Sequence, residues 1–182
     1  IIHFILLEGK LSLAKSKKIY GKWQYLTKNS KDLSLDSFHG LEFPGGEFFI
    51  DKKSNLLVNN STGNKLSNEN INRIIHAHPI YFMIIALRGS GASIQDIFDL
   101  LNYDTKNGPM LGQCNMTFNA QLKVDCKYFV KGQINSLIKK NSKKLGEIKI
   151  LDFSLTLFDV DSKNVGNVNY VWILPLGKNN EI

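Results

Sequence analysis

Two histidines separated by one residue, His76 and His78, are the side chains with the clearest potential for chemistry. They stand directly before Pro79 and an apolar run, which places both at the start of a predicted helix. Histidine exchanges a proton near neutral pH, so either residue suits proton transfer or substrate contact. The alternative is a structural histidine that caps the helix start, and it is the stronger alternative for His78. A His-x-His pair without a nearby cysteine or acidic cluster is not sufficient for a metal site, so no metal is predicted.

The two cysteines, Cys114 and Cys126, fall on the apolar side of an alternating pattern. This position is typical of small buried hydrophobic residues rather than activated nucleophiles. Reduced thiols are typical of a cytoplasmic protein, which is the location we expect. The short sequence Gly89-Ser-Gly91 is too short to cradle phosphates, and no cofactor is predicted.

The run from Pro79 to Leu87 is apolar at nearly every position and is followed by Gly89. Proline suits the first turn of a helix, and glycine commonly ends one. A helix that is apolar all round must be enclosed by other elements. The sequence therefore predicts a buried central helix.

Downstream, the hydrophobic period changes to two. Apolar and polar residues alternate without interruption from Cys114 to Tyr128, which predicts one long half-buried strand, continued after a bend by Val130 to Ile138. Two further strands are predicted over Ile148–Phe158, with a bulge near Leu151, and over Val168–Leu174. The chain is therefore predicted to be an α+β protein in which an antiparallel sheet surrounds one apolar helix.

The part before this core is harder to interpret. We expect residues 1–66 to form an N-terminal segment that packs on or precedes the core, and residues 67–182 to form the main domain, both within one structural unit. In the first part, Glu47 to Ile50 is a candidate short strand, and Asp51 to Lys65 is predicted to be a polar loop. A short helix is predicted to begin after Ser67.

The formal charge of +7 arises almost entirely from lysine, since Arg73 and Arg88 are the only arginines. Lysines spread along a chain usually lie on solvated surfaces. There is no zinc-ligand spacing, RNA-binding aromatic signature or arginine cluster, so a nucleic-acid partner is not predicted. No apolar run reaches the roughly 18 residues that a membrane span needs. The charge does permit a partner that carries phosphates or acidic side chains.

The stretch from Ile75 to Leu87 resembles the central helix of the MaoC-like, (R)-specific enoyl-CoA hydratase branch of the hot-dog fold, whose members read Val-His-Gly followed by ten residues that end in Ala-Leu. His76 matches the histidine of that motif, and Ala77 stands where the glycine lies. The order of later motifs also agrees from residue 73 to 175: Gly108-Pro109, Phe118, Lys131-Gly132, Gly146, Asp159-Val-Asp161 and Trp172-Ile-Leu-Pro175.

The resemblance implies a hydratase or dehydratase that acts on acyl-CoA or acyl-carrier-protein thioesters, with the acyl chain beside the central helix. It also implies a homodimer or a hot-dog heterodimer. Under this interpretation His76 and His78 are the candidate catalytic residues. Substrate contacts are expected at Ala77 and Pro79, at the helix start where a backbone N–H of the family polarises the thioester carbonyl, and at Gly108 and Gly112.

The sequence departs from the family at the Asp-x-Asn-Pro-x-His stretch that carries its acid and base. The nearest candidate, Asp51 to Leu57, has neither the proline nor the histidine. Two alternatives therefore remain open beside the hydratase: a non-catalytic hot-dog module that binds acyl groups or pairs with an active subunit, and an acyl thioesterase.

Overall fold

The computed structural model describes residues 17–29, 33–64 and 75–177. The predicted helix after Ser67 lies outside these residues. The described part begins with a helix over residues 17–28. The remaining elements follow in this order: η2 (Leu35–Phe38), β1 (Gly46–Ile50), α2 (Lys52–Ser61), α3 (Tyr81–Arg88), α4 (Ile94–Leu100), η4 (Thr105–Asn107), β2 (Met110–Phe118), β3 (Cys126–Ser142), β4 (Gly146–Phe158) and β5 (Asn164–Pro175).

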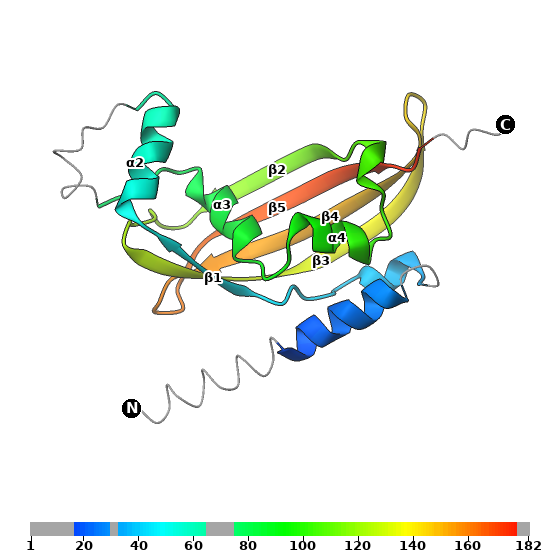
Figure 1. Ribbon diagram of the computed structural model, residues 1–182, viewed down its shortest axis with the longest axis horizontal. Coiled ribbons are helices and arrows are strands. Elements are labelled where there is room, and N and C mark those ends of the chain that lie inside the picture. Colours follow the sequence, from blue (N-terminus) through cyan, green and yellow to red (C-terminus); the bar gives the residue numbers. More distant parts are fainter. Residues whose placement is uncertain (1–16, 30–32, 65–74, 178–182) are drawn as a thin grey trace.

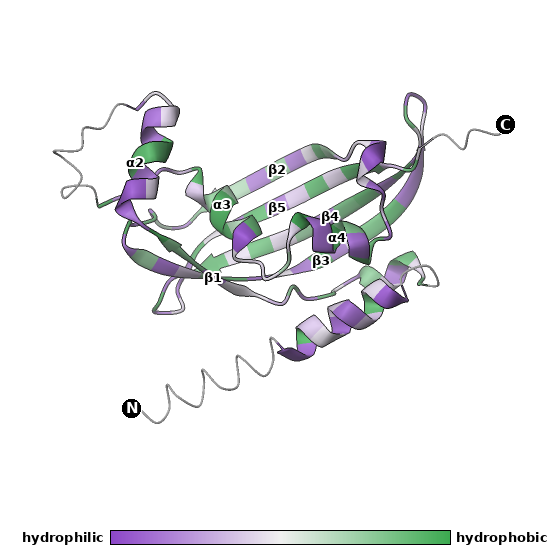
Figure 2. Ribbon diagram, in the orientation of Figure 1, coloured by the Kyte–Doolittle hydropathy of each residue, from purple (hydrophilic) through white to green (hydrophobic). Residues whose placement is uncertain are grey.

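The five strands form one antiparallel sheet in the order β1-β3-β4-β5-β2 (Figure 1). Helices α3 and α4 lie against one face of this sheet, and α2 stands at one end. Apolar and polar residues alternate along β4 and β5 (Figure 2), which each bury one side, whereas no residue of the edge strand β2 is buried. The predicted α+β architecture is confirmed.

The central helix is also confirmed, although α3 begins at Tyr81 after a turn at Pro79. Its sheet-facing side is buried and includes Phe82 and Ile85, whereas Met83 and Leu87 on the other side are half-buried. Gly89 ends the helix as predicted. Within the described residues, α3 is therefore buried on the side that faces the sheet and only half-buried on the opposite side.

The single strand predicted from Cys114 to Tyr128 is wrong. The chain leaves the sheet after Phe118 and re-enters at Cys126, with Asp125 in the left-handed backbone region at φ 53°. The two halves lie at different positions in the sheet, since β2 is an edge strand and β3 pairs with both β1 and β4. The loop between β2 and β3 also alternates, because its apolar side chains Leu122 and Val124 are buried although they do not belong to a strand. The sequence pattern therefore does not show where the strands end.

The polar loop predicted from Asp51 to Lys65 is also wrong in its larger part, because α2 occupies residues 52–61. The Asp51 carboxylate accepts a hydrogen bond from the Ser54 N–H and caps this helix. Two of its asparagines, Asn55 and Asn59, are buried and bonded to each other. Polar composition therefore concealed a helix whose inner face is stabilised by amide hydrogen bonds.

The predicted bulge near Leu151 lies instead on the neighbouring strand, where Asn135 interrupts the register between β3 and β4.

The N-terminal helix packs on the core through Trp23, whose indole N–H donates to the Glu42 carbonyl at 2.7 Å. The backbone at Gly45, before β1, lies directly against the backbone at Gly91, after α3. This close approach requires glycine, because a Cβ at Gly91 would lie 2.5 Å from the Gly45 carbonyl oxygen. Over the described ranges, no helix is long and apolar enough to cross a membrane.

Candidate functional site

The segment from His76 to Ile80 connects the sheet region to α3 and carries most of the predicted site residues. Its first part forms a β-bridge between His76 and Lys123, in which the Ala77 N–H donates to the Leu122 carbonyl at 2.9 Å. Ala77 is buried, while His76 and Pro79 are exposed. The segment is therefore held on one side by the loop between β2 and β3.

On its other side the segment is held by Asn55 of α2. The Asn55 Oδ1 accepts the His78 N–H at 2.8 Å, and the Asn55 Nδ2 donates to the His76 carbonyl at 3.4 Å. Asn59 and Asn64 extend this network by two further amide hydrogen bonds. Because Asn55 is fully buried, it fixes the backbone at both histidines.

Sequence reasoning missed Asn55. A signal was nevertheless present, since Asp51, Asn55 and Asn59 recur at the four-residue spacing of one helix face.

The His78 ring is engaged at both nitrogens. Its Nδ1 accepts the Ile80 N–H at 3.1 Å, and its Nε2 lies 3.2 Å from the Thr62 hydroxyl oxygen. An acceptor Nδ1 in a neutral ring leaves the proton on Nε2, which then donates to Thr62. This arrangement is that of a structural histidine which shapes the turn before α3.

The His76 side chain is exposed. Among the described residues neither it nor His78 forms an ion pair with a carboxylate. A general base is usually oriented by a second group, and no such group contacts His76 in the described structure. Proton transfer by His76 stays a prediction.

Backbone N–H groups at the start of α3 already have acceptors. Besides those of Ala77 and His78, the Tyr81 N–H donates to the His78 carbonyl at 3.0 Å and the Phe82 N–H to the Pro79 carbonyl at 3.0 Å. Together with the Ile80 N–H on the His78 ring, every N–H from Ala77 to Phe82 is used within the chain. A thioester carbonyl would therefore compete with an internal acceptor.

The electrostatics of this region are set by Asp51 and Tyr81. Hydrogen bonds from Ser54 hold the pKa of the Asp51 carboxyl below its usual value. Burial raises the pKa of the Tyr81 hydroxyl, and the negative charge of Asp51 raises it further. At neutral pH the site thus contains a charged helix cap and a neutral phenol, and neither is poised to exchange protons.

Gly108 and Gly112 lie at the opposite end of β2 from the His76–Ile80 segment. Gly108 ends η4, and Gly112 sits at an irregularity in the pairing of β2 with β5, where a Cβ would meet the Ile173 side chain at 3.0 Å. The strand residues between them separate Gly112 from the segment by about 20 Å and Gly108 by about 30 Å. The structure therefore brings Ala77 and Pro79 together with the histidines but leaves the two glycines apart from them.

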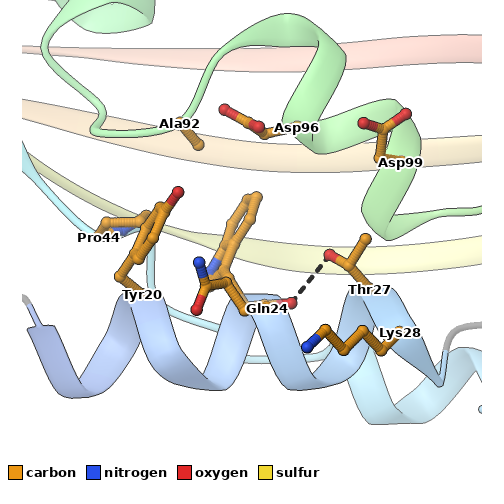
Figure 3. A pocket seen from close by; sticks show the side chains of 9 residues that line it. Tyr20, Gln24, Thr27, Lys28, Pro44, Ala92, Asp96 and Asp99 are labelled. Carbon is orange, nitrogen blue, oxygen red and sulfur yellow. Dashed lines mark hydrogen bonds between the residues drawn. The ribbon is translucent and has the colours of Figure 1, made fainter.

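A cavity of about 260 Å³ lies between the N-terminal helix and α4 (Figure 3). A second cavity, of about 300 Å³, lies beside it between the same helix and the loops at Gly45 and Gly91. None of the predicted site residues lines them. Their carboxylates serve α4 itself, since Asp96 bonds Ser93 in the helix cap and Asp99 accepts from Gln95 at 2.7 Å. In the part of the chain that the structure describes, no group of histidine, cysteine and acidic side chains could hold a metal.

No family model matches the sequence, and no curated protein is similar to it. Solved structures are similar in fold. The HadBC complex of Mycobacterium tuberculosis, a (3R)-hydroxyacyl-ACP dehydratase, aligns with a TM-score of 0.55 and 13% identity over 75% of this chain and 96% of its own. The MaoC-like dehydratase of Rhodospirillum rubrum gives 0.54 and 11% over 81% and 96%, and the ChsH1–ChsH2 complex of Mycobacterium tuberculosis gives 0.58 and 12% over 90% and 99%.

The chain has the hot-dog fold. The expectation drawn from Ile75–Leu87 is thereby confirmed for the architecture. At this level of identity the similarity shows the fold alone, so any function has to be inferred from the residues around the His76–Ile80 segment.

Proposed function

We propose that this hot-dog chain binds acyl-CoA or acyl-carrier-protein thioesters as a subunit of a hydratase or dehydratase, and that a partner hot-dog domain supplies the proton-transfer residues. The observation that supports this proposal is that the polar residues around the start of α3 bond to one another within the chain. Asp51 caps α2, Asn55 fixes the backbone at His76 and His78, and the His78 ring supports the turn. A cytoplasmic location is part of the same proposal.

One of the two edges of the sheet, the edge formed by β2, supports a partner. Strand β2 has no neighbour on its outer side within the described ranges. It also exposes apolar side chains there: Met110, Leu111, Met116 and Phe118. An unpaired apolar edge is a site of strand pairing, and two of the structures similar in fold are complexes by name. We propose a homodimer or a hot-dog heterodimer through β2.

An enoyl-absorbance assay tests the proposal. The protein alone, with crotonyl-CoA or a 3-hydroxyacyl-CoA, is expected to show no turnover, because no oriented acid–base pair is present. The same thioesters are expected to raise its melting temperature, since a ligand that binds only the folded state stabilises it. Failure of every acyl thioester to bind or to shift the melting temperature would contradict a thioester function altogether.

A second candidate is an intrinsically active hydratase that uses His76. It is favoured by one observation: the His76 side chain is exposed at the start of the central helix. In that case His76→Ala lowers the rate by about 10²–10⁴, the usual contribution of one proton-transfer group, and His78→Ala lowers it less. Turnover that survives both substitutions together would rule out the histidines as catalysts.

Substitution of Phe118 tests the proposed interface. Phe118 is 54% exposed although its ring packs edge-on against Phe82 of α3 at 4.6 Å. Phe118→Asp places a charge at the β2 edge and is expected to weaken dimerisation by about tenfold or more in sedimentation equilibrium.

Phe129→Asp is the matched control, because Phe129 is a similarly exposed phenylalanine on β3. An equal effect of the two substitutions would rule out the β2 edge as the interface. A strictly monomeric wild-type protein at micromolar concentration would contradict the homodimer.

A further inference from the structure

The hairpin that joins β3 to β4, which we call the basic hairpin, is rich in lysine. Residues 138–149 hold five of the 23 lysine and arginine residues and one of the 16 acidic residues. Their net charge is +4, against +7 for the whole chain. Five lysines in this short segment exceed the share that an even spread of the 23 basic residues along the chain would give, so the hairpin is locally enriched in positive charge.

Most of this charge is not neutralised. Lys139 pairs with Glu147 at 2.6 Å, and the Lys149 ammonium donates to the Leu101 carbonyl at 3.1 Å. The other three lysines, Lys140, Lys143 and Lys144, are exposed and form no ion pair with any residue that the structure describes.

The pKa of Lys149 is affected by its burial and by the neighbouring positive charge. Burial lowers the pKa of its ammonium, the positive charge of Lys139 lowers it further, and Glu147 partly offsets these effects. Charges of one sign on a narrow hairpin repel each other, and a bound anionic partner relieves this repulsion.

The basic hairpin projects from the sheet at the end far from α2 and the start of α3 (Figure 1). Strand β3 begins beside the loop that holds His76 and runs for 17 residues to the hairpin, a length of about 50 Å. A thioester bound beside His76 therefore cannot reach these lysines. The hairpin is a separate surface.

We propose that the basic hairpin is a docking site for the acidic surface of a partner protein. Exposed lysines at the end of β3 and in the turn match scattered carboxylates on such a surface. The hairpin contains no arginine, the residue best suited to bidentate phosphate contacts. It also contains no aromatic residue on which bases could stack or which could anchor in a bilayer interface. These two features favour a protein over a nucleic acid or a membrane.

Binding of labelled poly-L-glutamate to the full chain tests the proposal. The variant Lys140→Glu/Lys143→Glu/Lys144→Glu is compared with the control Lys17→Glu/Lys18→Glu/Lys22→Glu, which makes the same charge change at exposed positions of the N-terminal helix. The hairpin variant is expected to lose about tenfold or more in affinity, and the control less than about threefold. Binding by the wild type is expected to weaken as ionic strength rises toward about 0.15 M.

Two other ligands complete the experiment: vesicles that contain phosphatidylserine, and a single-stranded RNA oligonucleotide. An equal loss in the hairpin and control variants would overturn the proposal, because net charge alone would then explain binding. Tighter binding of the vesicles or the RNA, lost in the hairpin variant only, would also overturn it and assign the hairpin to that ligand. Thermal melts of each variant exclude misfolding as the cause.

Discussion

Phe153→Ala is expected to lower the free energy of unfolding by about 3–5 kcal/mol, a large fraction of the total stability of a domain of this size. Phe153 is fully buried at the centre of β4. Its ring contacts three other aromatic rings: Phe43 at 5.5 Å, Tyr170 at 5.1 Å and Trp172 at 5.0 Å between centroids. Removal of the ring leaves a cavity that rigid neighbours cannot fill, so the full transfer and cavity cost is expected.

Urea denaturation followed by circular dichroism measures this loss. Phe158→Ala is the matched control, because Phe158 lies on the same strand but is only half-buried and faces the other side, near Lys131. Its expected cost is about 1 kcal/mol. A larger loss at Phe158 than at Phe153 would show that the core does not lie on the helix-covered face.

Asn55→Ala is expected to have the second largest effect, a loss of about 2–4 kcal/mol. The substitution removes the acceptor of the His78 N–H and the donor to the His76 carbonyl, and it breaks the link to Asn59. Polar groups left without partners beside a fully buried site carry the full cost of desolvation. The start of α3 is expected to loosen as well.

Amide hydrogen exchange distinguishes this local effect from general destabilisation. Exchange at His78 is expected to accelerate in Asn55→Ala by more than exchange at core amides of β4. Asn115→Ala is the control, since Asn115 is exposed on β2, and it is expected to change stability by less than about 0.5 kcal/mol. Unchanged protection at His78 in Asn55→Ala would contradict the role of Asn55 as the fixing side chain.

The candidate site was predicted only in part. The sequence indicated the position of His76 and His78 at the helix start, because proline and an apolar run mark that boundary in any fold. It did not indicate that the His78 ring is bonded at both nitrogens. The bond to Thr62 joins residues 16 positions apart, and no local pattern specifies such a partner.

The sequence by itself determined the elements that bury one face: α3, β4 and β5 lie within a few residues of their predicted limits. Hydrophobic period reports local burial directly, so these elements and the α+β architecture could be predicted. The hot-dog fold was predicted from the resemblance of Ile75–Leu87 to the central helix of that fold. Only the tertiary structure decided that the alternation from Cys114 to Tyr128 is divided between β2 and β3, and that the polar stretch after Asp51 is the helix α2. Both depend on contacts between distant segments: the partner of a strand and the acceptor of a buried amide are chosen in space, and Asn55 meets His78 across 23 positions of sequence.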